Sequence, residues 1–197
     1  MRGKHMAKKN EFRPDKPRAG LLSKLYLTQK QRKSLLKWFL YTAVLLVLSV
    51  VQDVILCDLR PLGATSELVP CGIFLICVLE GLESGSVFAL VAALFYHFSG
   101  SSDGVYSIVL ITALSVGVTF FRQSYLQKGL GAAVLCVSAA MVVYELFMYG
   151  LALFLGLTTA GRIGAFLLKA VLSLLSVPVL YPLCLSIGKI GGESWKE

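Results

Sequence analysis

Five ionisable residues lie inside or at the ends of long apolar runs of this chain: Asp53, Glu80, His97, Glu145 and Lys169. An ionisable group surrounded by hydrocarbon is costly, so each such residue is a candidate for an ion or proton path. Glu145 lies near the middle of one predicted helix and Lys169 about a third of the way into the next. Their depths allow an ion pair between the two helices, which is more often architectural than part of a proton path. The other three, Asp53, Glu80 and His97, lie near predicted helix ends, where water can reach them. They are therefore weaker candidates for such a path.

The sequence carries no recognisable catalytic motif. GxSxG, a Walker loop, HExxH and a helical DxxxD are all absent, and Ser138, Tyr144 and Glu145 form no convincing triad with the distant His97. The five cysteines show no CxxC spacing, and only two histidines accompany them, so neither zinc nor a disulfide framework is expected. We predict a non-enzymatic protein with no catalytic residue, cofactor or metal.

The composition predicts an integral membrane protein with one helical domain. Hydrophobic residues make up 56% of the 197 residues and charged residues only 15%, and the mean hydropathy is +0.75. A soluble domain of this length needs more charged surface. The net charge of +8 is concentrated in residues 1–37, which hold 12 of the 19 Lys and Arg. No aromatic-basic platform accompanies these cations, so they indicate membrane topology rather than nucleic-acid binding.

Six apolar runs are predicted to cross the membrane as helices, forming an all-α, six-span bundle. Their predicted bounds are Leu36–Leu56, Leu68–Leu79, Val87–Phe98, Gly104–Phe121, Leu130–Leu157 and Ile163–Ile187. The segment Cys57–Glu67 is expected to be an exposed loop. Pro178 and Pro182 are expected to kink or end the last span.

The two short central runs are separated by the polar break Glu80–Gly85, and a second break, Ser99–Gly104, follows. Each short run either spans as a short helix or forms half of a re-entrant hairpin, and both options return the chain to the same side. Small residues recur every fourth position across the first break, which lets a neighbouring backbone approach closely. This stripe more often makes internal packing than a subunit contact, and it consists of Gly81, Gly85, Ala89 and Ala93.

Residues 1–28 are interpreted as a disordered basic tail and juxtamembrane segment, residues 29–190 as the transmembrane domain, and residues 191–197 as a short tail. Leu21–Lys37 either lies on the membrane surface, with its cations at anionic lipid head groups, or is a solvated basic segment. Thr28 followed by Gln31 resembles a capping box, so the first helix is expected to begin near there.

Both termini are predicted to be cytoplasmic. With six spans, the inner side then collects the basic head together with Arg122, Lys128, Lys189 and Lys196, whereas the outer loops hold only Arg60 and Arg162. Reading residues 68–98 as a single long helix would place Arg122 and Lys128 outside, and the positive-inside bias rejects that arrangement.

The order of these features resembles the rod-shape-determining membrane protein MreD family over roughly residues 36–190. The most telling part is the glycine turn from Gly100 through Gly104 to Tyr106, similar to the family's short turn followed by Gly-aliphatic-Tyr. The other matching segments are Val51-Gln52-Asp53, Leu68-Val69-Pro70, the glycine-broken hairpin Gly81–Gly85 and the region Pro178–Tyr181. One departure is that the family usually has an Asp several residues before the turn, whereas this chain has Ala93-Leu94-Phe95-Tyr96-His97.

The resemblance implies a non-enzymatic scaffold of the bacterial elongation machinery in the inner (cytoplasmic) membrane. Its implied partners are the bitopic protein MreC and, through it, the bacterial actin homologue and the cell-wall synthases that make peptidoglycan. It also implies a fold similar to the substrate-binding subunit of energy-coupling-factor vitamin transporters. The rival interpretation is therefore that the chain is such a vitamin-binding subunit, although Ala43 is followed four residues on by Val47, which breaks the Ala-xxx-Ala contact typical of those subunits.

Overall fold

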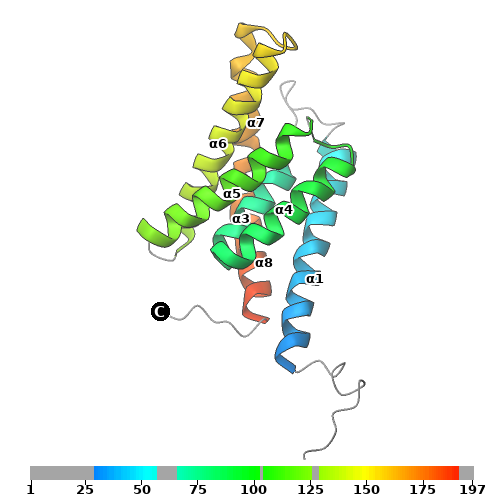
Figure 1. Cartoon of the computed structure of the whole chain (residues 1–197), viewed down its shortest axis with the longest axis vertical. Coiled ribbons are helices and arrows are strands. Elements are labelled where there is room, and N and C mark those ends of the chain that lie inside the picture. Colours follow the sequence, from blue (N-terminus) through cyan, green and yellow to red (C-terminus); the bar gives the residue numbers. More distant parts are fainter. Residues whose placement is uncertain (1–28, 57–65, 103, 126–128, 191–197) are drawn as a thin grey trace, which may run out of the picture.

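The fold is a bundle of helices around one central helix (Figure 1). The computed structural model describes residues 29–56, 66–102, 104–125 and 129–190, and within these ranges every regular element is helical. The predicted tails 1–28 and 191–197 lie outside the described residues. The elements are α1 (Gln29–Val50), the π-helical turn η2 (Val51–Leu56), α3 (Leu68–Glu80), α4 (Leu82–Phe98), α5 (Tyr106–Tyr125), α6 (Leu130–Phe154), the 3-10 turn η4 (Ala160–Arg162), α7 (Ile163–Leu174) and α8 (Val177–Ile190).

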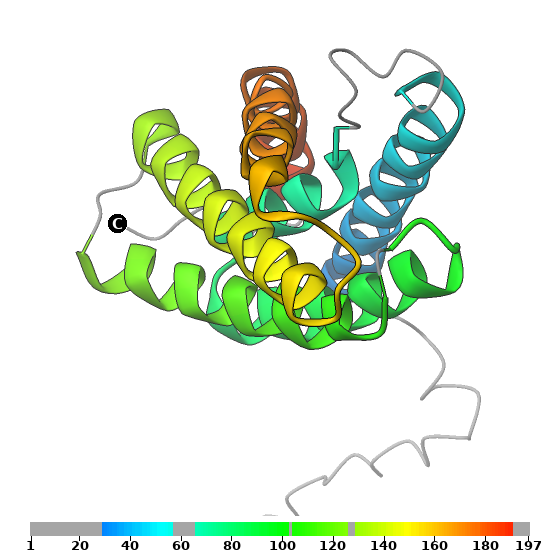
Figure 2. The same ribbon diagram turned by 90° about the horizontal axis from the view of Figure 1, so that it is seen from above.

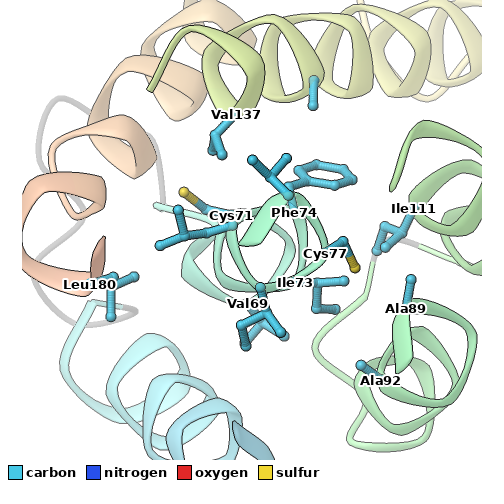
Figure 3. Close-up of a cluster of buried hydrophobic side chains, with 14 of the residues drawn as sticks. Val69, Cys71, Ile73, Phe74, Cys77, Ala89, Ala92, Ile111, Val137 and Leu180 are labelled. Atoms are coloured by element: carbon cyan, nitrogen blue, oxygen red, sulfur yellow. The ribbon is translucent and has the colours of Figure 1, made fainter. Parts of the chain in front are cut away.

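The central helix is α3, and every residue from Leu68 to Leu79 is buried. It packs against α1, α4, α5, α6, α7 and α8, which surround it when viewed from above (Figure 2) and along its own axis (Figure 3). A helix that is apolar on every face suits such an interior, because it has no polar side to present to water. Its large side chains, such as Phe74 and Ile76, are completely enclosed by the other helices.

One face of α1 follows the helical period and packs inward. Its buried residues are spaced three or four apart: Lys37, Tyr41, Leu45, Leu48 and, in η2, Gln52. This spacing aligns side chains along a single face of a helix. The middle of the face is apolar and both of its ends are polar, so α1 brings polar groups to the two ends of the central helix. The start of α1 at Gln29 agrees with the helix start predicted from Thr28 and Gln31.

The polar break between α3 and α4 is narrower than predicted. Only Gly81 is outside a helix, with φ 94°, a left-handed conformation that glycine adopts without strain. Residues Glu83 to Gly85 belong to α4. A Cβ added at Gly85 would lie 3.1 Å from both the Cα and the carbonyl oxygen of Cys77, so the two helices approach as closely as this glycine permits. The chain therefore folds back on itself as a tight hairpin.

The last apolar segment is divided into α7 and α8, which meet at an angle of 45°. The break falls at Leu175 and Ser176, directly before α8, and Pro178 lies in the first turn of α8. Proline lacks a backbone N–H and clashes with the preceding turn, so the prediction of a kink in this segment is confirmed. Pro182 is accommodated inside α8.

Three helical segments are long and apolar enough to cross a membrane, and the bent pair α7–α8 makes a fourth. These segments are Gln31–Leu56, Tyr106–Tyr125 and Leu130–Phe154. The all-helical class is therefore confirmed, and the length and composition of these segments suggest a membrane protein, while α3 and α4 are apolar but shorter. At 1.5 Å per residue, α3 is about 20 Å long, less than the roughly 30 Å of a hydrocarbon core. The total of six spans remains a prediction.

Candidate functional site

A cluster of polar groups closes the carboxyl end of α3. The Lys37 ammonium donates to Glu80 Oε2 at 2.6 Å, and the Tyr41 hydroxyl donates to Glu80 Oε1 at 2.6 Å. The same hydroxyl lies 3.2 Å from the carbonyl oxygen of Cys184 in α8. A Cβ added at Gly188 would lie 3.2 Å from that hydroxyl, so α8 presents a glycine where the side chains converge. We call Lys37, Tyr41 and Glu80, with the Cys184 carbonyl, the Glu80 cluster.

Arg122, in the last turn of α5, reaches the same end of α3. Its guanidinium donates to the backbone carbonyl of Val78, and its exposed fraction is only 8%. The last carbonyl groups of a helix have no partner within that helix, and the helix dipole favours a cation there. Because no water is present in the bilayer core to satisfy such groups, a protein side chain must do so. Arg122 therefore caps α3 from a neighbouring helix.

Side chains from two other elements cap the amino end of α3. The backbone N–H of Glu67 donates to Ser173 Oγ in α7 at 2.8 Å, and the N–H of Val69 donates to Gln52 Oε1 in η2 at 3.0 Å. The Gln52 amide in turn donates to the Tyr96 hydroxyl at 3.3 Å. Both ends of the central helix are thus satisfied by side chains from elsewhere in the bundle, which is what a helix removed from water requires.

Lys169 has a carboxylate partner that the sequence interpretation did not consider. Its ammonium lies 3.4 Å from Glu67 Oε1 and 5.2 Å from the ring centre of Phe166. Glu67 was expected to end an exposed loop, but it and Ser66 are buried, at 4% and 5% exposure, because they pack against Ser173. That expectation was wrong for these two residues. Residues 57–65 of the same loop lie outside the described residues.

Glu145 is completely buried in α6. The adjacent Tyr144 is also completely buried, and the edge of its ring meets Phe74 of the central helix with ring centres 6.3 Å apart. The sequence interpretation placed Glu145 near the middle of its span, and the structure adds that its side chain faces the interior of the bundle.

A set of hydroxyl contacts joins the end of α1 to the turn after α4. Ser101 donates to Asp53 Oδ2 at 2.6 Å, and Ser49 lies 3.3 Å from the same oxygen. His97 Nδ1 lies 2.9 Å from Ser102 Oγ. The carboxylate and the imidazole thus hold different serines, and these contacts do not form the relay of a nucleophilic triad. Among the described residues, no three His, Cys, Asp or Glu side chains come close enough together to hold a metal ion.

The small-residue stripe lies inside the protein. Gly85, Ala89 and Ala93 are buried, and the helices that pack most closely on α4 are α5 and α3. Gly81, the fourth member, forms the hairpin turn. The stripe is therefore a helix-packing surface within this chain and is not available to a second protein.

The family-like turn occupies the predicted place between α4 and α5. Gly100 has φ 79° and Gly104 has φ 140°, both in the region that favours glycine, and Tyr106 begins α5 with an exposed side chain. The two glycines reverse the chain within a few residues, which brings Ser101 to Asp53.

Sequence reasoning missed the roles of Lys37, Gln52, Arg122 and Ser173. Lys37 and Arg122 were counted only as cytoplasmic charges, yet both are buried. One signal was present: Lys37, Tyr41 and Gln52 fall on the same helical face as the buried leucines of α1. No comparable periodic signal identifies Ser173, because its role depends on the position of α3.

Many of these polar contacts cap the ends of helices or join one helix to another. Four of the five cysteines, Cys71, Cys77, Cys136 and Cys184, are free and buried. Such thiols behave as small hydrophobic groups. Comparisons with protein-family models, curated proteins and solved structures found no match for this chain. The resemblance to MreD therefore rests on the sequence features alone.

Proposed function

We propose that this chain is a non-enzymatic membrane scaffold of the bacterial elongation machinery. In this role it binds an MreC-like bitopic protein in the inner membrane and, through that partner, helps to organise the actin homologue and the enzymes of peptidoglycan synthesis. It crosses the membrane six times, with both termini in the cytoplasm. The proposal rests on the ordered features shared with the MreD family, and one structural observation favours it over a ligand-binding role.

That observation is the filled interior. The position at the middle of the bundle is occupied by α3, whose side chains are enclosed from Leu68 to Leu79 and whose two ends are capped by protein groups. A vitamin-binding subunit needs a concave site that encloses most of its ligand. A core filled by the chain's own residues favours the lipid-facing surface as the place where another molecule binds, as a scaffold requires.

The distribution of charge supports the proposed orientation. The exposed cations Arg32, Lys33 and Lys189 lie at the end of the molecule where α1 begins and α8 ends. The opposite end carries the exposed Arg162 and Asp53 and the Lys169–Glu67 pair. An excess of cations at one end favours the cytoplasm for that end.

The test is co-purification of the tagged chain with the MreC-like protein from the same genome, solubilised in mild detergent. We expect the partner at a stoichiometric level. A matched control is an unrelated six-span protein with the same tag. Absence of the partner contradicts the proposed role, and recovery of a stoichiometric vitamin by mass spectrometry would instead support the transporter subunit.

A further inference from the structure

The exposed surface of α4 differs from the other lipid-facing surfaces in its length. Its exposed apolar side chains form one continuous face, which we call the α4 face: Val87, Leu90, Val91, Leu94, Phe95 and Phe98. In Figure 1, α4 lies at the front of the molecule between α5 and α1. The inward side of α4 packs on α3 and α5, with a smaller contact to α1, and the α4 face is the exposed part of this helix.

The α4 face is short. From Val87 to Phe98 the helix rises about 17 Å, roughly half of the 30 Å hydrocarbon core. The exposed apolar residues of α1, from Leu35 to Ile55, cover about 30 Å, which matches the core. Those of α6, from Leu130 to Phe154, cover about 36 Å. Among the described helices, α4 therefore presents lipid with a clear deficit of apolar length relative to α1 and α6.

Acidic groups bracket the α4 face. The exposed Glu83 lies in the first turn of α4, before Val87. The exposed Asp53 lies beyond Phe98, where Ser101 donates to its carboxylate at 2.6 Å. A lipid bilayer can meet a short helix only by thinning or by drawing polar groups inward, whereas a second helix packed on the face removes the mismatch. Lys or Arg at the ends of that second helix would also complement the two acids.

We propose that the α4 face is the docking site for a single transmembrane helix of a bitopic partner, with Lys or Arg at its cytoplasmic end opposite Glu83. This inference rests on the proposed function, because it names the surface by which the scaffold holds its partner. The apolar side chains supply the packing area, and Glu83 fixes the register by pairing with the partner's cation near the membrane surface.

Disulfide cross-linking in native membranes tests the site. The full chain carries Cys57→Ser, which removes the thiol in the predicted outer loop, and one added cysteine: Val91→Cys on the α4 face, Val47→Cys on α1 or Val143→Cys on α6. The co-expressed MreC-like protein carries single cysteines along its transmembrane helix. We expect oxidation to give at least tenfold more heterodimer from Val91→Cys than from either control.

The outcomes separate this site from the function it depends on. Partner that co-purifies but cross-links to α1 or α6 overturns the α4 site and leaves the scaffold role standing. A Val91→Cys homodimer would mean that a second copy of this chain covers the α4 face, and it also overturns the proposal. Co-purification of the partner with no cross-link at Val91 overturns it as well, because the α4 face would then contact lipid. If no partner co-purifies, both proposals fail.

Glu83→Gln supplies a second test that does not depend on cysteine chemistry. Because Glu83 is exposed and its side chain makes no contact needed by the hairpin among the described residues, the variant is expected to fold normally. We expect Glu83→Gln to retain about fivefold less partner than the parent chain after a wash in low salt. The difference should shrink in high salt, because salt screens the Glu83 pair of the parent whereas apolar packing is insensitive to ionic strength. Retention equal to that of the parent chain in low salt contradicts the proposed charge pairing.

Discussion

The ammonium of Lys37 in α1 and the carboxylate of Glu80 in α3 are joined at 2.6 Å, although the two residues are 43 positions apart in the sequence. Both side chains are 8% exposed, so the pair is held largely out of water. The same carboxylate accepts from Tyr41, which also approaches α8. One glutamate at the end of the central helix thus links α1, α3 and α8 by polar contacts that hydrocarbon cannot replace.

Removing one member of this pair is expected to cost much more than removing both. Glu80→Gln leaves the buried Lys37 without its counter-charge and should destabilise the protein by about 3 kcal/mol, a loss typical of broken buried pairs. The double variant Lys37→Met with Glu80→Gln should recover most of that loss. The midpoint of thermal unfolding in detergent measures the difference. Equal midpoints for the single and double variants would contradict a buried, coupled pair.

Ser173→Ala is expected to weaken the amino end of the central helix. Its hydroxyl oxygen accepts from the Glu67 N–H at 2.8 Å, and loss of a helix cap costs about 1 kcal/mol. Ser138→Ala is the matched control, because that hydroxyl bonds only to Leu135 within its own helix. The thermal midpoint should fall for Ser173→Ala and stay close to the parent value for the control. A larger fall in the control would argue against the capping role.

Two glycine-to-alanine variants should shift stability in opposite directions. At Gly85 the new Cβ meets backbone of Cys77 at 3.1 Å, so the hairpin must open and the protein should lose about 1–3 kcal/mol. At Gly117 of α5 no atom lies within 4 Å, so alanine should add about 0.5–1 kcal/mol through its higher helix propensity. Thermal unfolding of both variants in the same detergent gives the comparison. Stabilisation by Gly85→Ala would contradict the close approach of α3 and α4.

The orientation of α6 can be measured by cysteine labelling. In a chain with Cys57→Ser, the variant Thr159→Cys should react with a membrane-impermeant maleimide in intact cells. Gln123→Cys, at the end of α5, should react only after the membrane is permeabilised, because the cation-rich end is expected to face the cytoplasm. The four buried native thiols provide a low background. The reverse pattern would place both termini outside, and labelling of both sites in intact cells would contradict the predicted crossing by α6.

Apolar runs and glycine breaks in the sequence predicted the helical elements well. The starts of α3 and α6, the end of α4, the turn at Gly81 and the reversal around Gly100 and Gly104 follow from hydrophobicity and local backbone chemistry, which act within a few residues. The kink before Pro178 follows from the missing N–H of proline. These features are local, so a single sequence contains their cause.

The polar contacts were harder to predict because they depend on which helices meet. Sequence reasoning offered Glu145, at a similar depth, as a possible partner of Lys169 and did not consider Glu67. The structure places Glu67 beside Lys169 because α7 packs near the start of α3. Arg122 was counted as a surface cation, but its partner is a backbone carbonyl that becomes available only when α3 stops at Glu80. Neither depth nor spacing contains that information.

The enclosure of α3 also constrains the order in which the protein can be made. Its 13 residues fall short of the roughly 20 that an independent spanning helix needs, so α3 has little tendency to remain in a bilayer alone. Its amino-terminal cap, Ser173, is synthesised about a hundred residues later. Chains that end before α7 therefore lack this cap and the contacts of α3 with α7 and α8, and we expect them to be degraded faster than the full chain.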